Sequence, residues 1–590
     1  MAPVVVLVAL ALPAAAQAAV RCVGTSGGDC TMTYPTPQQA VDAAVTGEDT
    51  IRFGAGTFGP VSTPKVLTYV GVGAGTPDSA AGATVIRQTV ASETGMDLQQ
   101  GGTVRALRAE GGFYPGGMGT AGIGIWFRAA TDGDMALTLV DVIATGGATT
   151  PPLGAGGIGL KLGDSLPTTG SKVATVTGGA FLGSATPGAG GRGVDSCCVQ
   201  STITGALMRT AGGPAVSADN DGTLTLNGTT VEGVTGIRTQ GPIKLTVNRS
   251  RVNAAGIGLF LRSRPNEPTT VSVRDTLVTA GSSPGETGGA VVLEGALGDP
   301  VVFDAVGSTF IGRGTSPAVH ARRDAADSAP VTTTLRNSIA RAEGTGVDLL
   351  ADRASIGAEF SSFNTRTLEN GGTAPEPGSA GNVAGDPMLA PDHSLLPGSP
   401  LIDRGDPAAL LPGELDLAGL ARSLDGTGDC VAVPDIGALE RPDACPPPPN
   451  VAPVMTNVGV TNRVFAPVAR SAAARRRVKR STRFRYTLSE PARVTIRIER
   501  VLPGRVRGRG ARRRCVEPTA RNRGARRCKR YKRVTTLAAN EQAGRQSTAF
   551  SGRVKGRALR RGRYRARLVA TDALGARSAE TRIALRVVRP

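Results

Sequence analysis

Aromatic side chains are scarce in this chain. Phe, Tyr and Trp make up 3% of the 590 residues, and Trp occurs once. The core therefore has to be built mainly from Val, Leu, Ile and Ala. Histidine is nearly absent as well, with only His320 and His393 in the sequence. No two cysteines have the CxxC spacing of a zinc site, so a zinc centre is not expected.

Long apolar runs are missing after the first residues, so no transmembrane segment is expected in the mature chain. The N-terminus has a short apolar run over Val4–Leu12 and then Ala16-Gln17-Ala18, a small-x-small sequence that signal peptidase accepts. No Lys or Arg precedes the run, which is atypical. We expect residues 1–18 to be a signal peptide and the mature protein to be secreted, free or associated with the cell surface.

The eight cysteines favour the same compartment, because disulfides persist outside the reducing cytosol. They fall into four close pairs, and three pairs have spacings that suit local disulfide-bonded loops. These three are Cys22 with Cys30, Cys430 with Cys445, and Cys515 with Cys528. The adjacent Cys197 and Cys198 leave three alternatives open: a bond between neighbours, two free thiols, or partners outside the chain.

Charge is divided unevenly along the chain. Residues 451–590 hold 39 Lys and Arg against 6 Asp and Glu, a balance of +33. Residues 1–450 hold 28 against 41, a balance of −13. A run of prolines lies near the change, within residues 442–455, and is expected to form a stiff linker. The two parts therefore present opposite electric fields to their surroundings.

Two short patterns recur through the acidic part. The first is a strand of alternating apolar residues followed by a small polar residue, at residues 224–231, 245–252, 271–278 and 334–339. The second is a glycine, replaced by Ser316 in one copy, followed by alternating apolar residues, at residues 122–127, 157–162, 213–218, 236–239, 256–261, 289–294, 316–321 and 346–350. Both patterns have the period of two that is typical of strands with one buried face.

The repeats predict a solenoid whose coils stack in register, because no helical segments lie between the strands. Glycines are expected at the tight corners. Asn227 and Asn248 occupy equivalent positions and are expected to form a hydrogen-bonded ladder. A β-sandwich is the alternative, but its strands would not keep one recurring two-strand unit.

The repeats resemble the right-handed parallel β-helix family, the pectate-lyase-like superfold. Residues Tyr34–Val45 also look like the amphipathic helix with which the family begins, with Thr36 as N-cap, and Asp49–Phe58 look like its first strand. Such a helix would cover the open end of the solenoid. The expected fold class is all-β, with a right-handed parallel β-helix solenoid over residues 19–360 followed by a small antiparallel β-sandwich.

Residues 361–441 resemble the choice-of-anchor Q domain, a closing module of bacterial secreted β-helix proteins. The resemblance rests on Gly385–Leu389, on the SPLIDRGD string over residues 399–406 and on the DIGALE string over residues 435–440. It implies that this segment is the C-terminal end of the β-helix. Its aspartates are expected to bond turn amides, namely Asp403, Asp406 and Asp435.

Residues 456–590 resemble a bacterial Ig-like or fibronectin-III-like module, on the strength of Leu559–Tyr564 followed by Ala570–Gly575. Alternating runs predict strands at residues 484–488, 494–498, 564–568 and 583–587. We expect Arg505–Lys532 to be an exposed loop.

The many basic residues of this part either form an ordinary solvated face or bind polyanions. Sequence-specific nucleic-acid binding is not expected, because no recognised motif occurs and aromatics are sparse. The expected partner is polysaccharide or another anionic cell-surface polymer, and salt should weaken that binding.

A row of outward side chains is expected along the second pattern, because residues between the inward Ile and Leu point away from the core. Stacking would place them about 5 Å apart per coil. The row comprises Trp126, Lys161, Arg238, Phe260, Glu294, His320 and Asp348. Its candidate sugar-binding residues are Trp126, Lys161, Arg238, Phe260, His320 and Asp348. A mixed solvated face is the alternative.

No catalytic motif is evident, since no Asp-Asp pair and no carboxylate cluster beside a basic residue stand out. Candidates for catalysis are Lys161, Arg238 or Arg262 as base, with Glu294, His320 or Asp348 assisting. No cofactor is expected, and calcium has only weak candidates in Asp425 and Asp429.

The sequence favours a secreted or surface-associated structural or adhesive protein that binds an anionic polymer, without assigned catalysis. The alternative is a carbohydrate-active enzyme, a polysaccharide lyase or glycoside hydrolase, acting on an acidic glycan. A phage- or adhesin-like trimer is a third hypothesis.

Overall fold

The computed structural model describes residues 18–589 except 26–27, 116–119, 130, 151–154, 165–168, 187–189, 220–221, 265–267, 282–287, 296–298, 324–328, 444–449, 469–478 and 510–511. The chain forms two compact units, residues 1–446 and 447–590. The expected signal peptide (but for its last residue), the middle of the expected linker and Cys445 lie outside the described residues. In the described part of the chain, no helix has the length and apolar character needed to cross a membrane.

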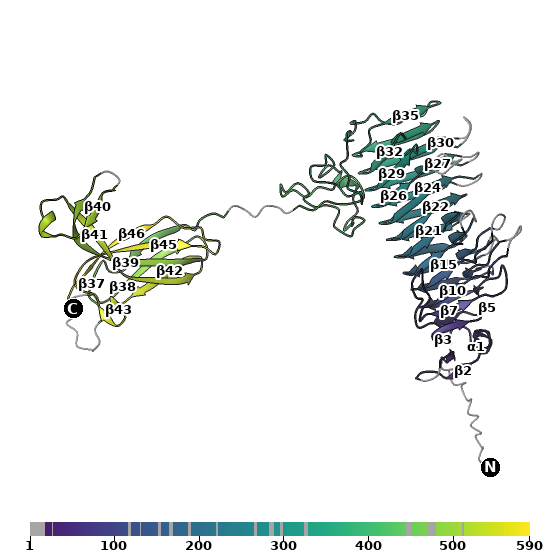
Figure 1. Ribbon diagram of the computed structural model, residues 1–590, viewed down its shortest axis with the longest axis horizontal. Helices are drawn as coiled ribbons and strands as arrows, with labels where there is room; N and C mark the ends of the chain where they lie inside the picture. The colour runs from purple at the N-terminus through teal and green to yellow at the C-terminus, as the bar shows by residue number, and fades with distance from the viewer. Residues whose placement is uncertain are drawn as a thin grey trace, which may run out of the picture. The chain divides into compact units, whose positions relative to one another are not determined.

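The first unit is built from parallel strands that stack coil upon coil in three columns (Figure 1). Each strand hydrogen-bonds to the equivalent strand of the coil before and the coil after it. Along one coil the chain passes from the first column to the second, then to the third, and then returns to the first. The predicted solenoid of stacked parallel strands is confirmed.

The first column is one sheet of 14 strands, and the other two columns form a sheet of 21 strands because β22 and β24 run through both. In stacking order, the first column contains β2 (Met32–Tyr34), β1 (Val20–Val23), β3 (Thr50–Phe53), β6 (Leu67–Val70), β9 (Gly101–Arg105), β12 (Met135–Val140), β15 (Lys172–Thr177), β18 (Gln200–Thr204), β21 (Gly222–Asn227), β23 (Ile243–Asn248), β25 (Thr269–Arg274), β28 (Val301–Val306), β31 (Val331–Arg336) and β34 (Ser355–Glu359).

The second column contains β4 (Gly56–Phe58), β7 (Thr84–Arg87), β10 (Arg108–Glu110), β13 (Ile143–Thr145), β16 (Ala180–Leu182), β19 (Leu207–Arg209), the beginnings of β22 (Thr230–Gln240) and β24 (Arg251–Arg262), β26 (Leu277–Ala280), β29 (Thr309–Gly314) and β32 (Ile339–Gly344). The third column contains β5 (Val61–Thr63), β8 (Met96–Leu98), β11 (Ile125–Phe127), β14 (Ile158–Leu162), β17 (Arg192–Cys197), β20 (Pro214–Asp219), the ends of β22 and β24, β27 (Gly289–Gly295), β30 (Val319–Arg323), β33 (Leu349–Asp352) and β35 (Arg366–Glu369).

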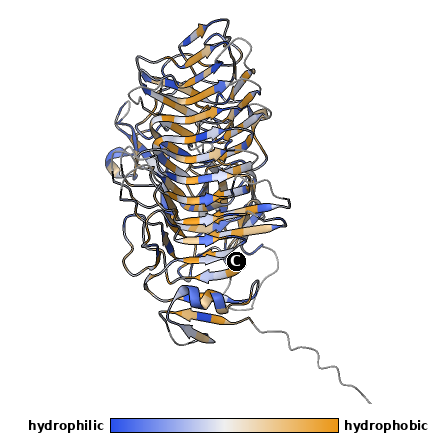
Figure 2. Ribbon diagram, turned by 90° about the vertical axis from the view of Figure 1, so that its right-hand side faces the viewer, coloured by the Kyte–Doolittle hydropathy of each residue, from blue (hydrophilic) through white to orange (hydrophobic). Residues whose placement is uncertain are grey.

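The two sequence patterns correspond to two of the columns. The first pattern supplies first-column strands such as β21 and β23, and the glycine-led pattern supplies third-column strands such as β14 and β27. Alternate residues of these strands enter one continuous core of Val, Leu, Ile, Ala and Phe that extends from Val23 to Phe363. Apolar and polar segments accordingly alternate along the strands in Figure 2.

The corner between the first and second columns is held by a ladder of buried hydroxyl groups. Successive coils place Thr229, Ser250, Thr276, Ser308, Ser338 and Ser361 at this corner. The Ser308 hydroxyl accepts a hydrogen bond from the Thr276 backbone N–H (3.3 Å) and donates one to the Val306 carbonyl (3.0 Å). The residue before each hydroxyl has a positive φ, for example Gly228 (59°) and Asn337 (51°), so the predicted glycine corners are confirmed only in part. The predicted ladder of Asn227 and Asn248 is also present, at 3.0 Å.

The N-terminal end is covered by helix α1 (Pro37–Ala43), whose buried Ala40 and Val41 join the solenoid core. Thr36 caps it by accepting a bond from the Gln39 backbone N–H, as the sequence predicted. The expectation that this helix precedes the first strand was wrong, because β1 and β2 come before it.

The disulfides match the spacing argument where the structure describes both partners. Cys22 is bonded to Cys30 and Cys515 to Cys528. Cys430 is also disulfide-bonded, and its expected partner lies outside the described residues. The open question of Cys197 and Cys198 is resolved, since the two neighbours are bonded to each other.

The end of the first unit, residues 385–443, is called the side segment here. It belongs to residues 361–441, which were expected to be the C-terminal end of the β-helix. Strand β35 (Arg366–Glu369) of that range does end the third column, whereas the side segment lies beside earlier coils (Figure 1). The Asn337 side-chain amide donates a hydrogen bond to the Asp406 carbonyl (2.9 Å) and accepts one from the Asp406 backbone N–H (2.7 Å). Thr309 accepts a bond from the Ala438 backbone N–H at 2.9 Å.

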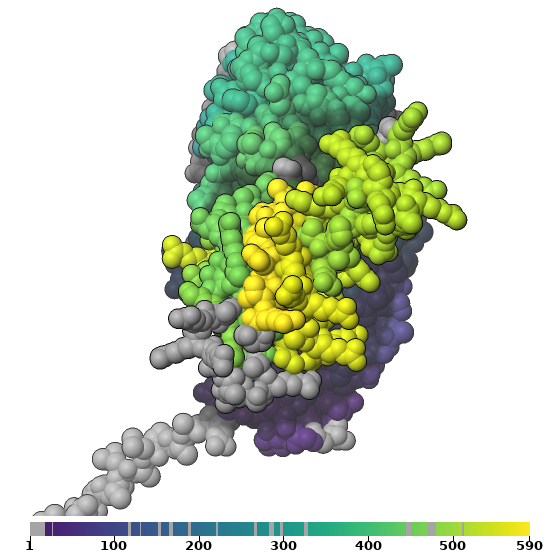
Figure 3. Space-filling model, turned by 90° about the vertical axis from the view of Figure 1, so that its left-hand side faces the viewer, coloured from purple at the N-terminus to yellow at the C-terminus, as the bar shows by residue number. Residues whose placement is uncertain are grey.

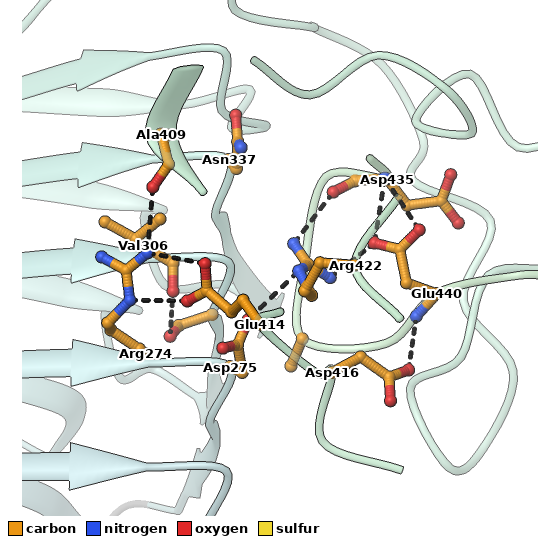
Figure 4. A network of polar contacts seen from close by, with 12 residues as sticks. Arg274, Asp275, Val306, Asn337, Ala409, Glu414, Asp416, Arg422, Asp435 and Glu440 are labelled. Atoms are coloured by element: carbon orange, nitrogen blue, oxygen red, sulfur yellow. Dashed lines mark hydrogen bonds and ion pairs between the residues drawn. The ribbon is translucent and has the colours of Figure 1, made fainter. Parts of the chain in front are cut away.

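Ion pairs of two arginines connect the side segment to the solenoid. The Arg422 side chain is 1% exposed and lies 3.1 Å from Asp275 of the corner and 2.7 Å from Glu440 of the side segment (Figure 4). Beside it, Arg274 contacts Glu414 at 2.6 and 2.9 Å. Burial raises the pKa of Glu440 to about 9 and that of Asp275 to about 8. The cluster therefore holds extra protons at neutral pH.

The aspartates of the side segment bond turn amides, as the sequence predicted. Asp403 accepts a bond from the Gly426 N–H (3.0 Å), Asp406 from Ala408 (2.9 Å) and Asp435 from Arg441 (2.7 Å). The segment contains little regular structure apart from the 3₁₀ turn η1 (Pro407–Ala409), so these bonds define its path.

The second unit has two sheets that share one core. The smaller antiparallel sheet contains β36 (Met455–Val460), β38 (Thr482–Leu488) and β42 (Gly544–Phe550). The larger contains β37 (Val464–Phe465), β46 (Thr581–Val587), β45 (Gly562–Thr571), β39 (Ala492–Arg507), β40 (Arg514–Val516) and β41 (Arg527–Glu541), and only its β37–β46 pairing is parallel. Short strands β43 (Arg553–Val554) and β44 (Arg557–Ala558) pair with each other, and η3 (Ala520–Asn522) is a 3₁₀ turn. Side chains of both sheets, including Phe484, Phe550 and Leu568, form the core.

The four predicted strands of this unit are confirmed within β38, β39, β45 and β46. The predicted loop over Arg505–Lys532 was wrong at both ends, because β39 continues to Arg507 and β41 begins at Arg527. Long side chains stand out from the lime-coloured part of this unit in Figure 3.

Candidate binding site

The outer face of the third column carries a row of polar and aromatic side chains. Strand pairing places Trp126 beside Lys161, and Arg238 lies beside Phe260 further along the same row. Asp195 and Ser217 occupy the two positions between Lys161 and Arg238. The predicted register is therefore correct for these four sequence-derived candidates. Neighbouring members belong to neighbouring coils, which are about 5 Å apart.

The indole of Trp126 is covered by cations. The Arg128 guanidinium lies 3.7 Å from the ring centroid and the Lys161 ammonium lies 4.3 Å from it. Arg128 also forms two bonds with the Asp97 carboxylate, at 2.8 and 3.0 Å. The ring's negative face holds the cations in place. This end of the row therefore presents positive charge beside an aromatic ring, which suits an acidic sugar better than a neutral one.

Two carboxylates lie near the middle of the row. Burial raises the pKa of Asp195, and the nearby Asp219 raises it further, while Arg192 and Lys161 act in the opposite direction. Arg192 contacts Asp195 at 2.9 Å. One oxygen of Asp219 is buried without a hydrogen-bond partner among the described residues, and so is Nε of Arg238. This neighbourhood, here called the central carboxylate site, has unused hydrogen-bonding capacity.

Glu294 lies on the same face as the predicted row, but two residues further along its strand. Val292, not Glu294, stands beside Phe260, and Glu294 pairs with Arg262 in the strand register. Its carboxylate is 3.2 Å from Arg262 and 2.6 Å from Arg322. The three side chains form a compensated ion-pair cluster that leaves the carboxylate 7% exposed.

His320 stands beside Val292 in the predicted row, but it is buried. Its pKa is lowered to about 4, first by burial and then by the Arg322 charge. A pKa of about 4 keeps the imidazole neutral near pH 7. Its Nδ1 has no hydrogen-bond partner in the described part of the protein.

Asp348 does not belong to the row. Leu350 occupies that position, beside His320. The Asp348 carboxylate is buried and accepts bonds from the backbone N–H groups of Ala342 (2.7 Å), Asn364 (2.6 Å) and Thr365 (3.1 Å). These bonds make it a turn-stabilising residue, so it does not reach the surface where a sugar would bind.

The two calcium candidates are engaged with the backbone. Asp425 accepts bonds from Gly428 (2.7 Å) and Cys430 (2.8 Å), and Asp429 accepts one from Val431 (2.8 Å). Within the described ranges, no group of three or more His, Cys, Asp or Glu residues could hold a metal ion. Calcium binding stays an untested hypothesis.

Sequence reasoning missed several charged members of the face, among them Asp97, Arg128, Asp195 and Asp219. A signal for Asp195 was present, because Gly191–Cys197 has the same glycine-led alternation as the recognised copies. The copy at residues 213–218 stops one residue before Asp219. Extending that copy by one residue would have found Asp219, and recognising the copy at Gly191–Cys197 would have found Asp195.

Comparison with known proteins adds no relative: no family model matches the chain, and no curated protein does.

Proposed function

We propose that the protein is an exported, non-catalytic structural or adhesive protein that binds acidic polysaccharide. In this proposal the solenoid is a right-handed parallel β-helix, residues 361–441 belong to an anchor-Q-like module, and the second unit is an Ig-like sandwich. The disulfides support export, since such bonds persist in oxidising compartments. The balance of +33 over residues 451–590 supports an anionic partner.

The observation that carries the proposal is the row on the third column. Trp126, Lys161, Arg238 and Phe260 lie on one face of successive coils, with cations over the indole. A sugar chain that runs along the stacking direction would meet aromatic edges and cations at intervals of about one coil. The carboxylates that line this face lie beside arginines, as at Asp97, Asp195 and Glu294, and each cancels the charge of its partner. The attraction for a polyanion therefore has to come from the other cations of the row, Lys161 and Arg238.

The single tryptophan gives a direct test. Because Trp126 is the only Trp in the chain, intrinsic tryptophan fluorescence of the intact protein reports on this row alone. Polygalacturonate should change the fluorescence saturably at low salt, and neutral dextran should not. Lys161→Ala should weaken the response about tenfold, as expected for the loss of a charge-assisted contact. Lys244→Ala, an exposed lysine of the first column, is the matched control. An unchanged spectrum with polygalacturonate would refute the proposal for this row.

A second function, an enzyme acting on acidic glycan, is favoured by the central carboxylate site. A carboxyl group with a raised pKa beside a second carboxylate is the arrangement that general acid and base catalysis uses. The test is to incubate the protein with uronate polymers, with and without calcium, and to follow unsaturated ends and reducing sugar. Turnover that Asp195→Asn abolishes would favour the enzyme, whereas binding without turnover favours the structural protein.

A further inference from the structure

A cavity of about 750 Å³ lies along β37, β39, β41, β45 and β46 of the second unit. Six cationic side chains line it: Arg463, Lys529, Arg563, Arg565, Arg582 and Arg586. A cavity of this volume is in the range of sites for small ligands or short chain segments. This cavity is called the basic cavity below.

Two of the six cations have carboxylate partners. Glu499, whose side chain is 3% exposed, lies 2.5 Å from Arg565, and Glu580 lies 2.6 Å from Arg582. These pairs fix Arg565 and Arg582 in the wall. The other four cations have no ion-pair partner in the part of the unit that the structure describes. The basic cavity therefore keeps a local excess of positive charge.

The strand register brings two of the unpaired arginines together. Arg563 of β45 stands directly opposite Arg586 of β46, and Val464, the neighbour of Arg463, stands beside Arg586 on the other side. Like charges directly opposite each other on neighbouring strands destabilise a sheet. An oxyanion bound between the two guanidinium groups would remove this repulsion, because each planar fork can bond a carboxylate or phosphate in two places.

On β39 and β41 the lining of the cavity is apolar and aromatic except for Lys529, which stands opposite Pro503. Val501 and Pro503 belong to it, and Tyr531 stands directly opposite Val501 in the sheet. The Arg565 guanidinium lies 3.4 Å from the centroid of the Tyr531 ring and holds that ring in place. A ligand that carries an anionic group on one side and an apolar ring face on the other would satisfy both walls. An acidic sugar residue has this form.

We infer that the basic cavity binds an anionic sugar unit of an acidic polysaccharide, with its carboxylate between Arg563 and Arg586 and its ring against Tyr531 and the Val501 wall. The inference rests on the proposed function, because it assumes an acidic polymer as partner. It adds a defined site in the second unit to the row on the solenoid. A short segment of the polysaccharide would enter the basic cavity.

The test uses the full-length protein and trigalacturonate as probe, with calorimetric titration at about 150 mM salt. The double variant Arg563→Gln with Arg586→Gln should raise the Kd at least about tenfold, since it removes two charge-assisted contacts. The control double variant is Arg485→Gln with Arg545→Gln on the smaller sheet, which removes the same charge from exposed positions. It should change the Kd by less than about twofold. Thermal unfolding of both variants verifies the fold.

The outcomes separate the inference from the proposed function. Equal weakening by both double variants would show that only net charge matters and would overturn the defined site. Unchanged affinity in the cavity variant, with binding retained, would overturn the site and leave polymer binding in place. Binding of polyphosphate in the cavity but not of trigalacturonate would overturn the assignment of a sugar. Failure of the wild-type protein to bind any acidic polymer would reject the proposed function itself.

Discussion

The two units of the chain use charge in opposite ways. In the first, the buried Arg422 lies between Asp275 and Glu440, and ion pairs connect segments that are far apart in the sequence. In the second, basic residues outnumber acidic ones so heavily that Arg563 and Arg586 face each other across a sheet. Buried charge in the first unit therefore connects distant segments of the chain, whereas the excess of basic residues on the second unit, like the cations of the solenoid row, is available to a partner.

The largest expected effect tests the buried charge of the first unit. Arg422→Met should destabilise the docking of the side segment by about 2–5 kcal/mol, because two buried carboxyl groups, protonated at neutral pH, lose the polar group beside them at about 1–3 kcal/mol each. Hydrogen exchange over residues 401–441 should rise accordingly. The control is Arg336→Met, which breaks an exposed ion pair with Glu359 and should cost about 1 kcal/mol or less. Equal effects of the two changes would contradict the distinction between buried and exposed charge.

The stability of the two units should depend on pH with opposite signs. Glu440 and Asp275 have pKa values raised by burial to about 9 and about 8, so the folded first unit holds protons that the unfolded chain releases. Their contribution to stability is present at low pH and is lost as the pH rises from about 5 to about 9. In the second unit, bonds from Arg567 and Arg582 lower the pKa of Glu580, so its contribution is lost as the pH falls through that lowered pKa.

The measurement is the urea midpoint of the first unit at several pH values, followed through Trp126 fluorescence. Glu440→Gln should flatten the alkaline decline, because it removes one of the titrating groups. If the stability of the first unit rose between about pH 5 and about pH 9, the raised pKa values of Glu440 and Asp275 would not control docking of the side segment.

A smaller effect is expected from the hydroxyl ladder of the first unit. Ser308→Ala should lower the stability of the first unit by about 1–3 kcal/mol, since the buried Thr276 N–H loses its acceptor. Ser547→Ala, at an exposed serine that accepts a bond from Arg483, should change stability by about 0.5 kcal/mol or less. Chemical unfolding of each variant provides the comparison. If Ser308→Ala left the stability of the first unit unchanged, the neighbouring coils would compensate for the lost hydroxyl group.

The solenoid could be predicted from the sequence because its signal is local and repeated. The alternation in Leu224–Val231 and Gly256–Leu261 fixes which side chains point inward, and stacking then fixes which residues become neighbours. The second column escaped notice because its strands are short and follow the corner directly, as at Ile143–Thr145. Such a strand is too short to show a period of its own.

The side segment and most of the charged face depend on contacts between distant residues. Nothing near Arg422 in the sequence indicates that it meets Asp275, because the segment's path is set by turn bonds and not by a repeating pattern. Asp348 was placed in the row because its neighbours alternate, but bonds from the backbone N–H groups of Ala342 in β32 and of Asn364 and Thr365 hold its carboxylate inward. Register predicts neighbours within a sheet, and it does not predict how loops bury a side chain.

The central claim is that the intact protein holds an acidic polymer by its cations without cleaving it. The most direct measurement is the Kd for polygalacturonate at about 50 mM and about 300 mM salt, with product analysis of the same samples. We predict saturable binding that weakens at least about tenfold at the higher salt, and no unsaturated ends or new reducing sugar. Absence of binding at both salt concentrations, or turnover of the polymer, would contradict the account.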